Sequence, residues 1–541
     1  MITQIHSPLR RLSAKPLAAL LAIALAGCAL APRSTVQTKP SVQAPAATPQ
    51  RNLTGFAEGL RCMDDTLFRF GVRDVSLMIE ELQDNTRKLG AGTRDMMISA
   101  ISDMTRRSRG VRLVTFGQDN QNIVTLINLA QRTSQFKVVP QYDIRGSITQ
   151  FDEDTSKIQA GIAASLLQPV LNMIGLRLAA SRNASVLGFD ASVIQTADLS
   201  LLPGVTSKNT VVILREETGA GDGVAQIRNG SLSFSLLVSR NEGVAQSLRN
   251  IVELASIELI GKLVRVPYWR CLNLPDDHPE IAREIDDWYF AKQGSAELTQ
   301  FLQEQLRNRK FYNGAADGKS NPAYEEALRA YRSGLKLASN TPGSEIDLAT
   351  YRAFLTQPVP PAPPKPFGLT PAELAAQATA SANSSTRAPG DNTAPPPPRD
   401  FALGVLPGKP VYRRGENVEF TVTATQARFV YCFMQSPSNG KIQRVFPNRF
   451  QRDPRIEANQ PMSLPGASGF KIAAGSEGGE RQILGCFATE REIYNDLPSS
   501  LRWGDFEDIR LGSFAEIQAA FSKIAGTEVP FVGNVINLTN P

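Results

Sequence analysis

The sequence predicts a multidomain α+β protein with an N-terminal α/β domain, a small helical module and a β-rich C-terminal domain. The chain has 541 residues, which is enough for several domains. Two stretches rich in Pro, Ala, Ser and Thr, 28–51 and 357–400, carry too few large apolar residues to fold. We expect the first to be a flexible tether and the second a Pro-rich linker. The segments left, 52–275, 280–356 and 401–541, differ in the spacing of their apolar residues.

Residues 1–27 have the three parts of an export signal: a basic start, an apolar run and small residues before a cysteine. The apolar run, Pro16 to Ala26, has eleven residues, whereas a membrane-spanning helix needs ~20. Leu25-Ala26-Gly27-Cys28 resembles the lipobox of bacterial lipoproteins. The resemblance implies cleavage before Cys28, acylation of Cys28 and, because Ala29 follows it, an anchor in the outer membrane facing the periplasm. The alternative is a short buried helix before an unmodified cysteine.

Composition argues against nucleic-acid binding and against several kinds of catalysis. The net charge is +6, but three of the basic residues belong to the expected signal, so charge gives no support for a nucleic-acid partner. His278 is the only histidine outside that signal, which excludes Ser–His and Cys–His catalysis and most histidine-based zinc sites. We therefore expect no catalytic residue, metal or cofactor. An enzyme that uses Asp276 and Asp277 is the weaker alternative, because adjacent carboxylates suit a loop better than an acid–base pair.

Four cysteines besides Cys28 are widely spaced and form no C-x-x-C pair: Cys62, Cys271, Cys432 and Cys486. Metal ligation needs closer clustering, whereas an oxidising periplasm favours disulfides. Four cysteines allow three pairings. We expect Cys62–Cys271 and Cys432–Cys486, because each pair then lies within one predicted domain. Buried free thiols are the alternative.

The first domain alternates strand and helix patterns. Apolar runs predict buried strands, and a late helix has apolar residues spaced for one face. The expected elements are strands at 75–79, 111–116, 136–139 and 142–148, a helix capped by Thr93 and stopped by Gly110, and a helix from Val244 to Leu259.

Two further segments are candidates for membrane β-hairpins. Ser231 to Arg240 alternates between apolar residues and mostly serine, as a membrane strand of ~9–11 residues does. We expect it to pair with Thr210 to Glu217 through a turn at Gly219 to Gly223. A second hairpin is expected between Lys157 and Leu201, with a strand from Val193 to Leu201. A half-buried strand of a soluble sheet alternates in the same way, so both interpretations stay open.

The order of these motifs resembles the curli secretion-channel lipoprotein (CsgG) family. A strand, Asp84-Asn85-Thr86, a helix, a strand, Tyr142 to Phe151 and a late helix running into Cys271 follow one another behind the lipobox. The resemblance implies a ring-shaped homo-oligomer in the outer membrane, to which each protomer lends β-hairpins from 157–201 and 210–240. Unfolded adhesin or amyloid-like subunits would pass through the ring. Arg87 and Lys88 would line its lumen, where the best-known members carry aromatic and amide side chains.

The second segment is predicted to be helical, with leucines on one helix, a glycine-turned loop at Phe311 to Gly318 and a second helix. It resembles the small three-helix peptidoglycan-binding module and departs from that pattern at Tyr324 and Arg332. Binding of peptidoglycan and a plain helical spacer are both open. The apolar positions of the two helices are Leu298, Leu302, Leu306, Tyr324, Leu328 and Tyr331.

The third segment is β-rich. Gly415 to Ala424 alternates as a half-buried strand with Val418, Phe420 and Val422 inward, and a strand at 429–433 follows. The later turn Phe446-Pro447-Asn448 completes a resemblance to an uncharacterised β-sandwich domain found at the ends of bacterial envelope lipoproteins. Protein binding is the expectation for it.

Together these features predict an outer-membrane lipoprotein whose ring exports or attaches surface fibre subunits. The alternative is a non-channel scaffold lipoprotein that anchors to peptidoglycan or to partner proteins.

Overall fold

The computed structural model describes most of the chain after residue 55. Every described residue lies in the unit Thr54–Pro541, into which the chain divides after Leu53. The expected signal, Cys28 and the tether are outside the described residues, and so are the strand expected at 136–139 and the segment 157–181. The described residues are 56–90, 92–114, 140–152, 182–216, 223–229, 232–238, 243–337, 346–364, 366–368, 402–413, 415–435, 440–466, 470–474, 481–525 and 531–539.

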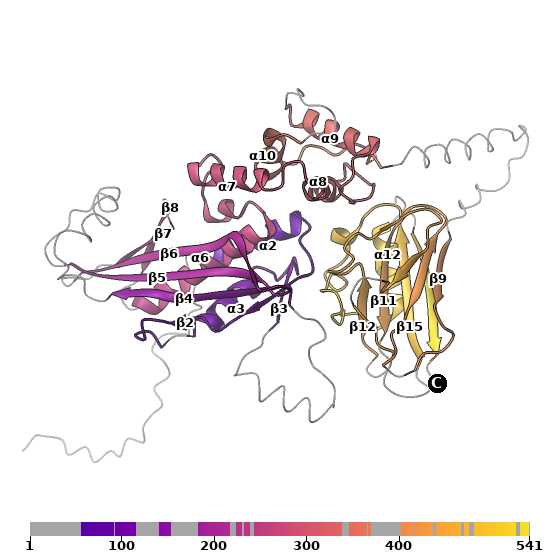
Figure 1. The fold of residues 1–541 in the computed structure, drawn as a ribbon, viewed down its shortest axis with the longest axis horizontal. Helices are drawn as coiled ribbons and strands as arrows, with labels where there is room; N and C mark the ends of the chain where they lie inside the picture. The colour runs from indigo at the N-terminus through magenta and orange to yellow at the C-terminus, as the bar shows by residue number, and fades with distance from the viewer. Residues whose placement is uncertain are drawn as a thin grey trace, which may run out of the picture. The chain divides into compact units, whose positions relative to one another are not determined.

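The first domain is built on a sheet with the strand order β3-β1-β4-β5-β6-β7-β8, in which β2 lies beside β4 (Figure 1). β1 runs parallel to β3 and β4, and each strand from β4 to β8 is antiparallel to the next. The elements are α2 (Ala57–Arg69), β1 (Val75–Ile79), β2 (Gln83–Asp84), α3 (Thr93–Asp103), β3 (Val111–Val114), β4 (Tyr142–Asp152), β5 (Arg182–Gln195), β6 (Ser200–Glu216), β7 (Gly223–Asn229), β8 (Leu232–Val238), α6 (Gly243–Val264) and the 3-10 helix η3 (Tyr268–Leu272).

The strands expected at 75–79, 111–116 and 142–148 are confirmed as β1, β3 and β4 within the described residues. The helix expected after them is α3, but its N-cap residue is Gly92 and Thr93 is already its first helical residue, so the expected cap is wrong by one position.

The expected pairing of Thr210 to Glu217 with Ser231 to Arg240 is wrong. Residues 210–214 of β6 pair with β7, and β8 also pairs with β7. Alternation predicts the face of a strand and not its partner. β7 begins at Gly223, inside the glycine-rich segment expected to be the turn, and only Gly230 and Ser231, a Gly-Ser pair typical of hairpin turns, separate β7 from β8.

The strand expected from Val193 to Leu201 is also wrong, because the chain reverses within it. β5 ends at Gln195 and β6 begins at Ser200, with Leu199 in the left-handed region at a φ of 60°. The Asp198 carboxylate accepts hydrogen bonds from the Ser200 amide at 3.0 Å and its hydroxyl at 2.7 Å, which closes this turn.

Helix α6 lies across one face of the sheet (Figure 1) and packs on β5 and β6 on one side and on α2, α3 and η3 on the other. Burial from Ile251 to Ile260 is therefore continuous, rather than confined to the single face that its apolar spacing predicts. A close approach at Gly261 seats η3 on the helix, since a Cβ there would lie 2.3 Å from the Tyr268 Cβ. Cys62 of α2 and Cys271 of η3 form a disulfide, the first of the two expected pairs.

The second segment is helical, as predicted. Side chains of His278, Ser295, Asn321 and Asp347 cap the four helices that lie in its described residues. Tyr331 and Phe354 stack at 4.2 Å between ring centroids in its core. The helices are α7 (Pro279–Phe290), α8 (Ala296–Asn308), α9 (Pro322–Gly334) and α10 (Leu348–Thr356).

The Pro-rich linker begins later than its composition predicts. Pro360 is buried, and Phe367 pairs with the helical module, donating its amide to the Phe311 carbonyl at 2.8 Å and accepting from the Asn313 amide at 2.7 Å. An extended proline segment leaves an intervening Phe free to form such a pair. Residues 358–364 and 366–368 therefore belong to the module.

The C-terminal domain has two sheets around one apolar core. One has the order β14-β10-β9 and the other β12-β11-β15-β16, with β13 beside β11. Val418, Phe420 and Val422 are buried in this core as predicted, and Cys432 and Cys486, on neighbouring strands, form the second expected disulfide. The elements are β9 (Leu403–Pro407), β10 (Phe420–Ala424), β11 (Arg428–Gln435), β12 (Ile442–Phe446), β13 (Arg455–Ile456), β14 (Met462–Leu464), β15 (Arg481–Thr489), the 3-10 helix η4 (Tyr494–Asp496), α12 (Phe514–Ala525) and β16 (Phe531–Thr539).

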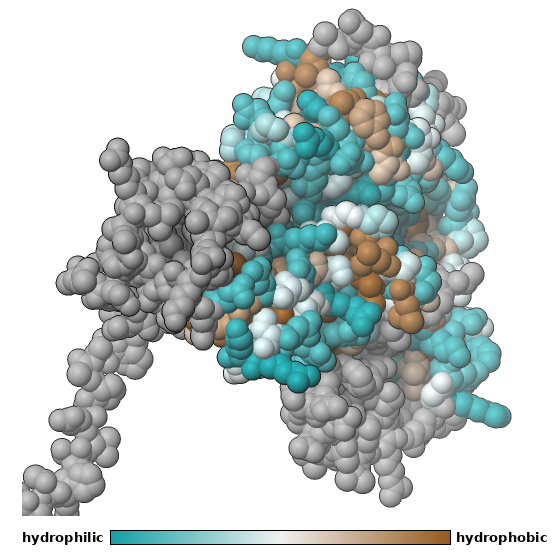
Figure 2. Space-filling model, turned by 60° about the vertical axis from the view of Figure 1, so that its left-hand side comes forward, coloured by the Kyte–Doolittle hydropathy of each residue, from teal (hydrophilic) through white to brown (hydrophobic). Residues whose placement is uncertain are grey.

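Hydrophilic residues predominate on the face drawn in Figure 2, and hydrophobic residues form small separate groups there. Leu199 and Leu201, at the turn between β5 and β6, are among the most exposed large apolar side chains, with 74% and 53% of their surface accessible. Of the helices in the described part of the chain, none combines the length and apolar character needed to cross a bilayer.

Candidate functional site

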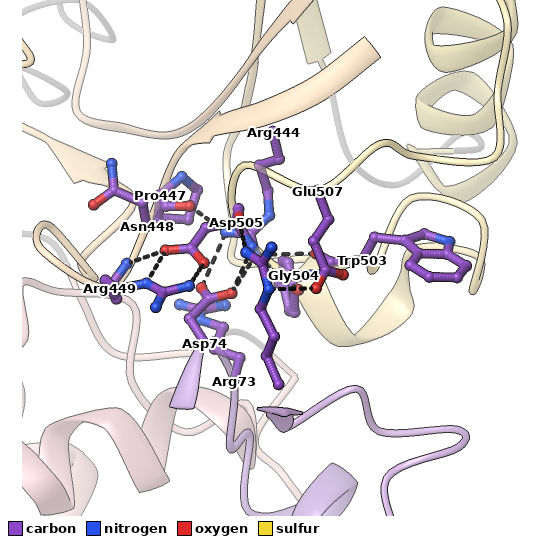
Figure 3. Close-up of polar contacts among 12 residues, drawn as sticks. Arg73, Asp74, Arg444, Pro447, Asn448, Arg449, Trp503, Gly504, Asp505 and Glu507 are labelled. Atoms are coloured by element: carbon purple, nitrogen blue, oxygen red, sulfur yellow. Dashed lines mark hydrogen bonds and ion pairs between the residues drawn. The ribbon is translucent and has the colours of Figure 1, made fainter. Parts of the chain in front are cut away.

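The buried carboxylate of Asp74 joins the first domain to the C-terminal domain. Asp74 lies in the loop between α2 and β1 at a φ of 58°, a conformation that Asp tolerates better than most residues. Its oxygens accept hydrogen bonds from both terminal nitrogens of Arg444, at 2.6 and 3.1 Å, and from the Asp505 amide at 3.0 Å (Figure 3). One carboxylate therefore binds two separate segments of the C-terminal domain.

Arg444 projects from β12 and is fully buried. Besides Asp74 it donates to the carbonyls of Pro447 and Trp503, and its guanidinium lies 5.1 Å from the centroid of the Tyr494 ring. Pro447 belongs to the Phe446-Pro447-Asn448 turn, so the motif that suggested the domain's family lies in its contact with Asp74. The Asn448 side chain closes this turn, donating to the Val445 carbonyl at 2.8 Å.

A second buried pair supports the first. Arg449 donates to the Asp505 carboxylate from its backbone amide at 2.8 Å, from Nε at 2.9 Å and from Nη2 at 2.5 Å. This fixes the segment around Asp505 and therefore the amide that Asp505 offers to Asp74 (Figure 3).

Asp74 and Arg444 stay ionised in spite of their burial. Burial by itself would raise the pKa of Asp74, but the adjacent Arg444 guanidinium and its hydrogen bonds hold the pKa of that carboxyl below its usual range. Burial would lower the pKa of Arg444, yet the Asp74 charge raises it above its ordinary value. Each group thus stabilises the charged form of the other.

A parallel set of ion pairs brings in the helical module. Arg307 of α8, whose side chain is 2% exposed, bonds Asp453 at 2.6 Å and Glu492 at 3.1 Å, both in the C-terminal domain. Arg73 also reaches Glu492, at 3.0 Å. Burial would raise the pKa of Glu492, but Arg307 and Arg73 lower it. Glu492 therefore links all three parts of the chain.

The same contact includes a strand at the edge of the first domain's sheet. Arg112 on β3, an end strand of the sheet path, bonds Glu507 at 2.9 Å and the Asp505 carbonyl at 3.2 Å. The Arg109 guanidinium lies 3.9 Å from the centroid of the Trp503 ring. An open strand edge invites pairing with another chain. Here residues of the C-terminal domain bind the Arg112 side chain of that strand.

We call this set of contacts the interdomain network: Arg73, Asp74, Arg112, Arg307, Arg444, Arg449, Asp453, Glu492, Asp505 and Glu507. Its charges are largely satisfied by one another, so the arrangement is suited to coupling domains. In the described part of the chain, no three His, Cys, Asp or Glu side chains are grouped so as to hold a metal ion.

Sequence reasoning missed the interdomain network. Asp74 and Arg444 are separated by 370 positions, and nothing near Asp74 marks it. The sequence of the C-terminal domain did contain an indication of the network. Arg444 interrupts the otherwise apolar end of the strand Ile442 to Phe446, and a charged residue at such a position needs a buried partner.

The two residues expected to line a pore, Arg87 and Lys88, lie in the loop after β2 and are both exposed. Arg87 is exposed at a φ of 57°, and Lys88 reaches back to the Phe151 carbonyl of β4 at 3.1 Å. Asp84 holds their loop by accepting from the amides of Thr86, at 2.9 Å, and Leu89, at 2.5 Å. The loop is thus a compact turn anchored to β4.

The adjacent carboxylates weighed for catalysis have structural contacts. Asp276 accepts from Arg270 at 2.6 and 2.9 Å and from the Trp269 indole at 2.8 Å. Burial would raise the pKa of Asp276, but these donors lower it. His278 accepts from the Glu280 amide at 3.3 Å and so caps α7.

Comparison with known proteins identifies one domain. Residues 411–492 match a family model described as a domain of unknown function, DUF4384. The match includes the Phe446-Pro447-Asn448 turn, Arg444 and Arg449, whereas Asp505 lies beyond it. Among solved structures, a Xanthomonas campestris protein of the DUF330 family is similar at 10% identity and a TM-score of 0.17, over 37% of this chain and 86% of that one. No curated protein matches the sequence.

Proposed function

We propose that the protein is an outer-membrane lipoprotein of the curli and adhesin secretion type, anchored at Cys28 and facing the periplasm. In this proposal the first domain assembles into a homo-oligomeric ring that exports or attaches surface fibre subunits. The observation that carries it is the antiparallel extension of the sheet: β5 has 14 residues and β6 has 17. Both exceed the ~9–11 residues that a membrane strand needs.

The free edge of the sheet supports assembly with further copies. The interdomain network binds Arg112 of β3 at one end of the sheet path. Among the described strands, β8 forms the other end. An end strand presents unpaired backbone groups and is a natural place for a neighbouring protomer to add a strand. Arg87, exposed after β2, is our candidate for a basic lining of the lumen, together with Lys88.

The remaining domains would then act on the periplasmic side. The Arg307 ion pair joins the helical module to the C-terminal domain, and the Asp74 ion pair joins that domain to the first. A ring of such protomers would carry both domains in fixed positions, available to peptidoglycan or to the exported subunits.

A second candidate function is a non-channel scaffold that anchors to peptidoglycan or to partner proteins. The buried ion pairs favour it, because they make a single block of three parts whether or not a ring forms. Binding to purified sacculi would be its expected activity.

Liposome conductance separates the two. We expect the full-length lipidated protein to form rings visible by negative-stain electron microscopy and to conduct ions after reconstitution. The matched control is Cys28→Ala, which cannot be acylated and should not insert. Lipidated protein that stays monomeric and non-conducting, but is pulled down by sacculi, would contradict the ring and support the scaffold.

A further inference from the structure

A cavity of about 650 Å³ lies where the first domain, the helical module and the C-terminal domain meet. This volume is within the range of sites for small ligands. One face of α8 lines it with Glu297, Phe301 and Glu304, which are spaced four and three residues apart and so lie on the same side of the helix. Arg452, an exposed side chain, also lines the cavity, which therefore reaches the protein surface.

The end of the cavity near Glu297 is positively charged. Lys292 and Arg265 act on Glu297 there, and Lys262 also lines the cavity. Lys292 pairs with Glu297 at 2.6 Å, and Lys262 donates to the Thr206 carbonyl at 2.9 Å. In the described part of the chain Arg265 donates no hydrogen bond, and its guanidinium acts on Glu297 and Tyr351 through charge alone. A planar guanidinium with free donors is suited to a carboxylate.

The other end has an unsatisfied acceptor. Glu304 has no hydrogen-bond donor among the described residues. Burial raises its pKa, although Arg307, Arg73 and Arg452 act in the opposite direction. Glu304 is half-buried and lines the cavity, so its carboxylate is open to a ligand that donates a hydrogen bond.

The spacing of the two ends sets the size of the ligand. Glu297 and Glu304 are seven residues apart on α8, which corresponds to about 10 Å along a helix. An extended peptide spans about 3.3–3.6 Å per residue, so a tripeptide has its termini about 10 Å apart. Phe301 lies between the two ends, and the centroid of its ring is 6.1 Å from that of Tyr351. These rings give an apolar wall for the middle residue.

We propose that this cavity binds a short zwitterionic peptide of about three residues, with its C-terminal carboxylate on Arg265, its N-terminal ammonium on Glu304 and an apolar middle side chain on Phe301. The proposal does not depend on whether the protein forms a ring.

Calorimetric titration of the full-length protein with Ala-Leu-Ala tests it. We expect binding by the free tripeptide and at least tenfold weaker binding when the peptide is N-acetylated or C-amidated. C-terminal amidation of the peptide should not weaken its binding to Arg265→Gln any further. N-terminal acetylation should likewise not weaken its binding to Glu304→Gln any further. Arg329→Gln and Glu326→Gln change exposed residues of α9 and are the matched controls; both should bind as the unmodified protein does.

Three results would overturn the proposal. These are no binding of the free tripeptide at millimolar concentration, equal binding of the capped and free peptides, and a loss on amidation without a loss on acetylation. The last would indicate a site for anions only. Thermal unfolding of the variants beside their controls checks that each remains folded.

Discussion

Single residues couple the domains, and we expect substitution of Asp74 to have the largest effect on this coupling. Its carboxylate has three donors from the C-terminal domain, and the two side chains of the ion pair are 0% and 2% exposed. Water cannot replace a partner at such a position. Removing one member of a buried pair therefore leaves an uncompensated charge.

We expect Asp74→Ala to lower the free energy of unfolding by about 3–5 kcal/mol, because Arg444 is left buried without its partner. Denaturant unfolding measures this. Asp103→Asn is the matched control: it removes the exposed ion pair with Arg106 and should cost less than about 1 kcal/mol. Equal effects of the two substitutions would contradict the role given to Asp74.

Asp143 on β4 is expected to make stability depend on pH in the opposite sense from Asp74. It is 1% exposed, and its Oδ1 has no hydrogen-bond partner. Burial and the nearby Glu80 raise its pKa to about 7. The folded state then binds the proton more tightly than the unfolded chain, so stability falls as pH rises between ~4 and ~7.

Asp143→Asn keeps the shape of the neutral carboxyl and removes this titration. We expect the variant to be more stable than the unmodified protein at pH 8, by on the order of 2–4 kcal/mol, and to show a smaller difference at pH 5. Unfolding curves at both pH values, with Asp103→Asn beside them, provide the measurement. A difference that is the same at both values would count against the raised pKa.

At the scale of elements, periodicity predicted the strands β1, β3 and β4, the helices of the module and the inward face of β10. Periodicity did not predict which strands pair with each other. Residues 210–217 were expected to pair with residues 231–240, which contain β8, whereas β7 lies between these two strands. Alternating residues determine which face is buried, but turn residues determine which strand follows, and Gly230-Ser231 was the informative pair.

The disulfide pairs were predictable from domain boundaries alone. Cys62–Cys271 closes a separation of 209 residues and Cys432–Cys486 one of 54. For loops this long the chain-entropy model gives about 4–5 kcal/mol each. We expect the double variant Cys62→Ser/Cys271→Ser to unfold at lower denaturant than a Cys28→Ala control. Peptide mapping without reductant should recover both pairs; a link from Cys62 to Cys432, or free thiols, would refute them.

At the scale of the whole molecule, the sequence predicted three parts but not their contact. Composition locates linkers and cannot show that Arg307 finds Glu492, or that Arg112 finds Glu507, because these partners are distant in the chain. Even the linker was misjudged at its start, where Phe367 pairs with the helical module. Tertiary contacts of a few residues determine both how the three parts meet and where the linker begins.

If the interdomain network holds the parts together, a cut in the linker should not release the C-terminal domain. We expect a protease site inserted after Gly390 to be cleaved while the two fragments still co-elute in size-exclusion chromatography. Adding Asp74→Ala should separate them, and adding Asp103→Asn should not. Separation without any substitution would show that the network is too weak to couple the domains.

Native mass spectrometry of the full chain, extracted from membranes in detergent, tests the central claim most directly. The proposed function predicts a protomer that begins at an acylated Cys28 and assembles into one defined multiple of its mass. A protomer that retains residues 1–27, lacks the lipid and remains monomeric would contradict it.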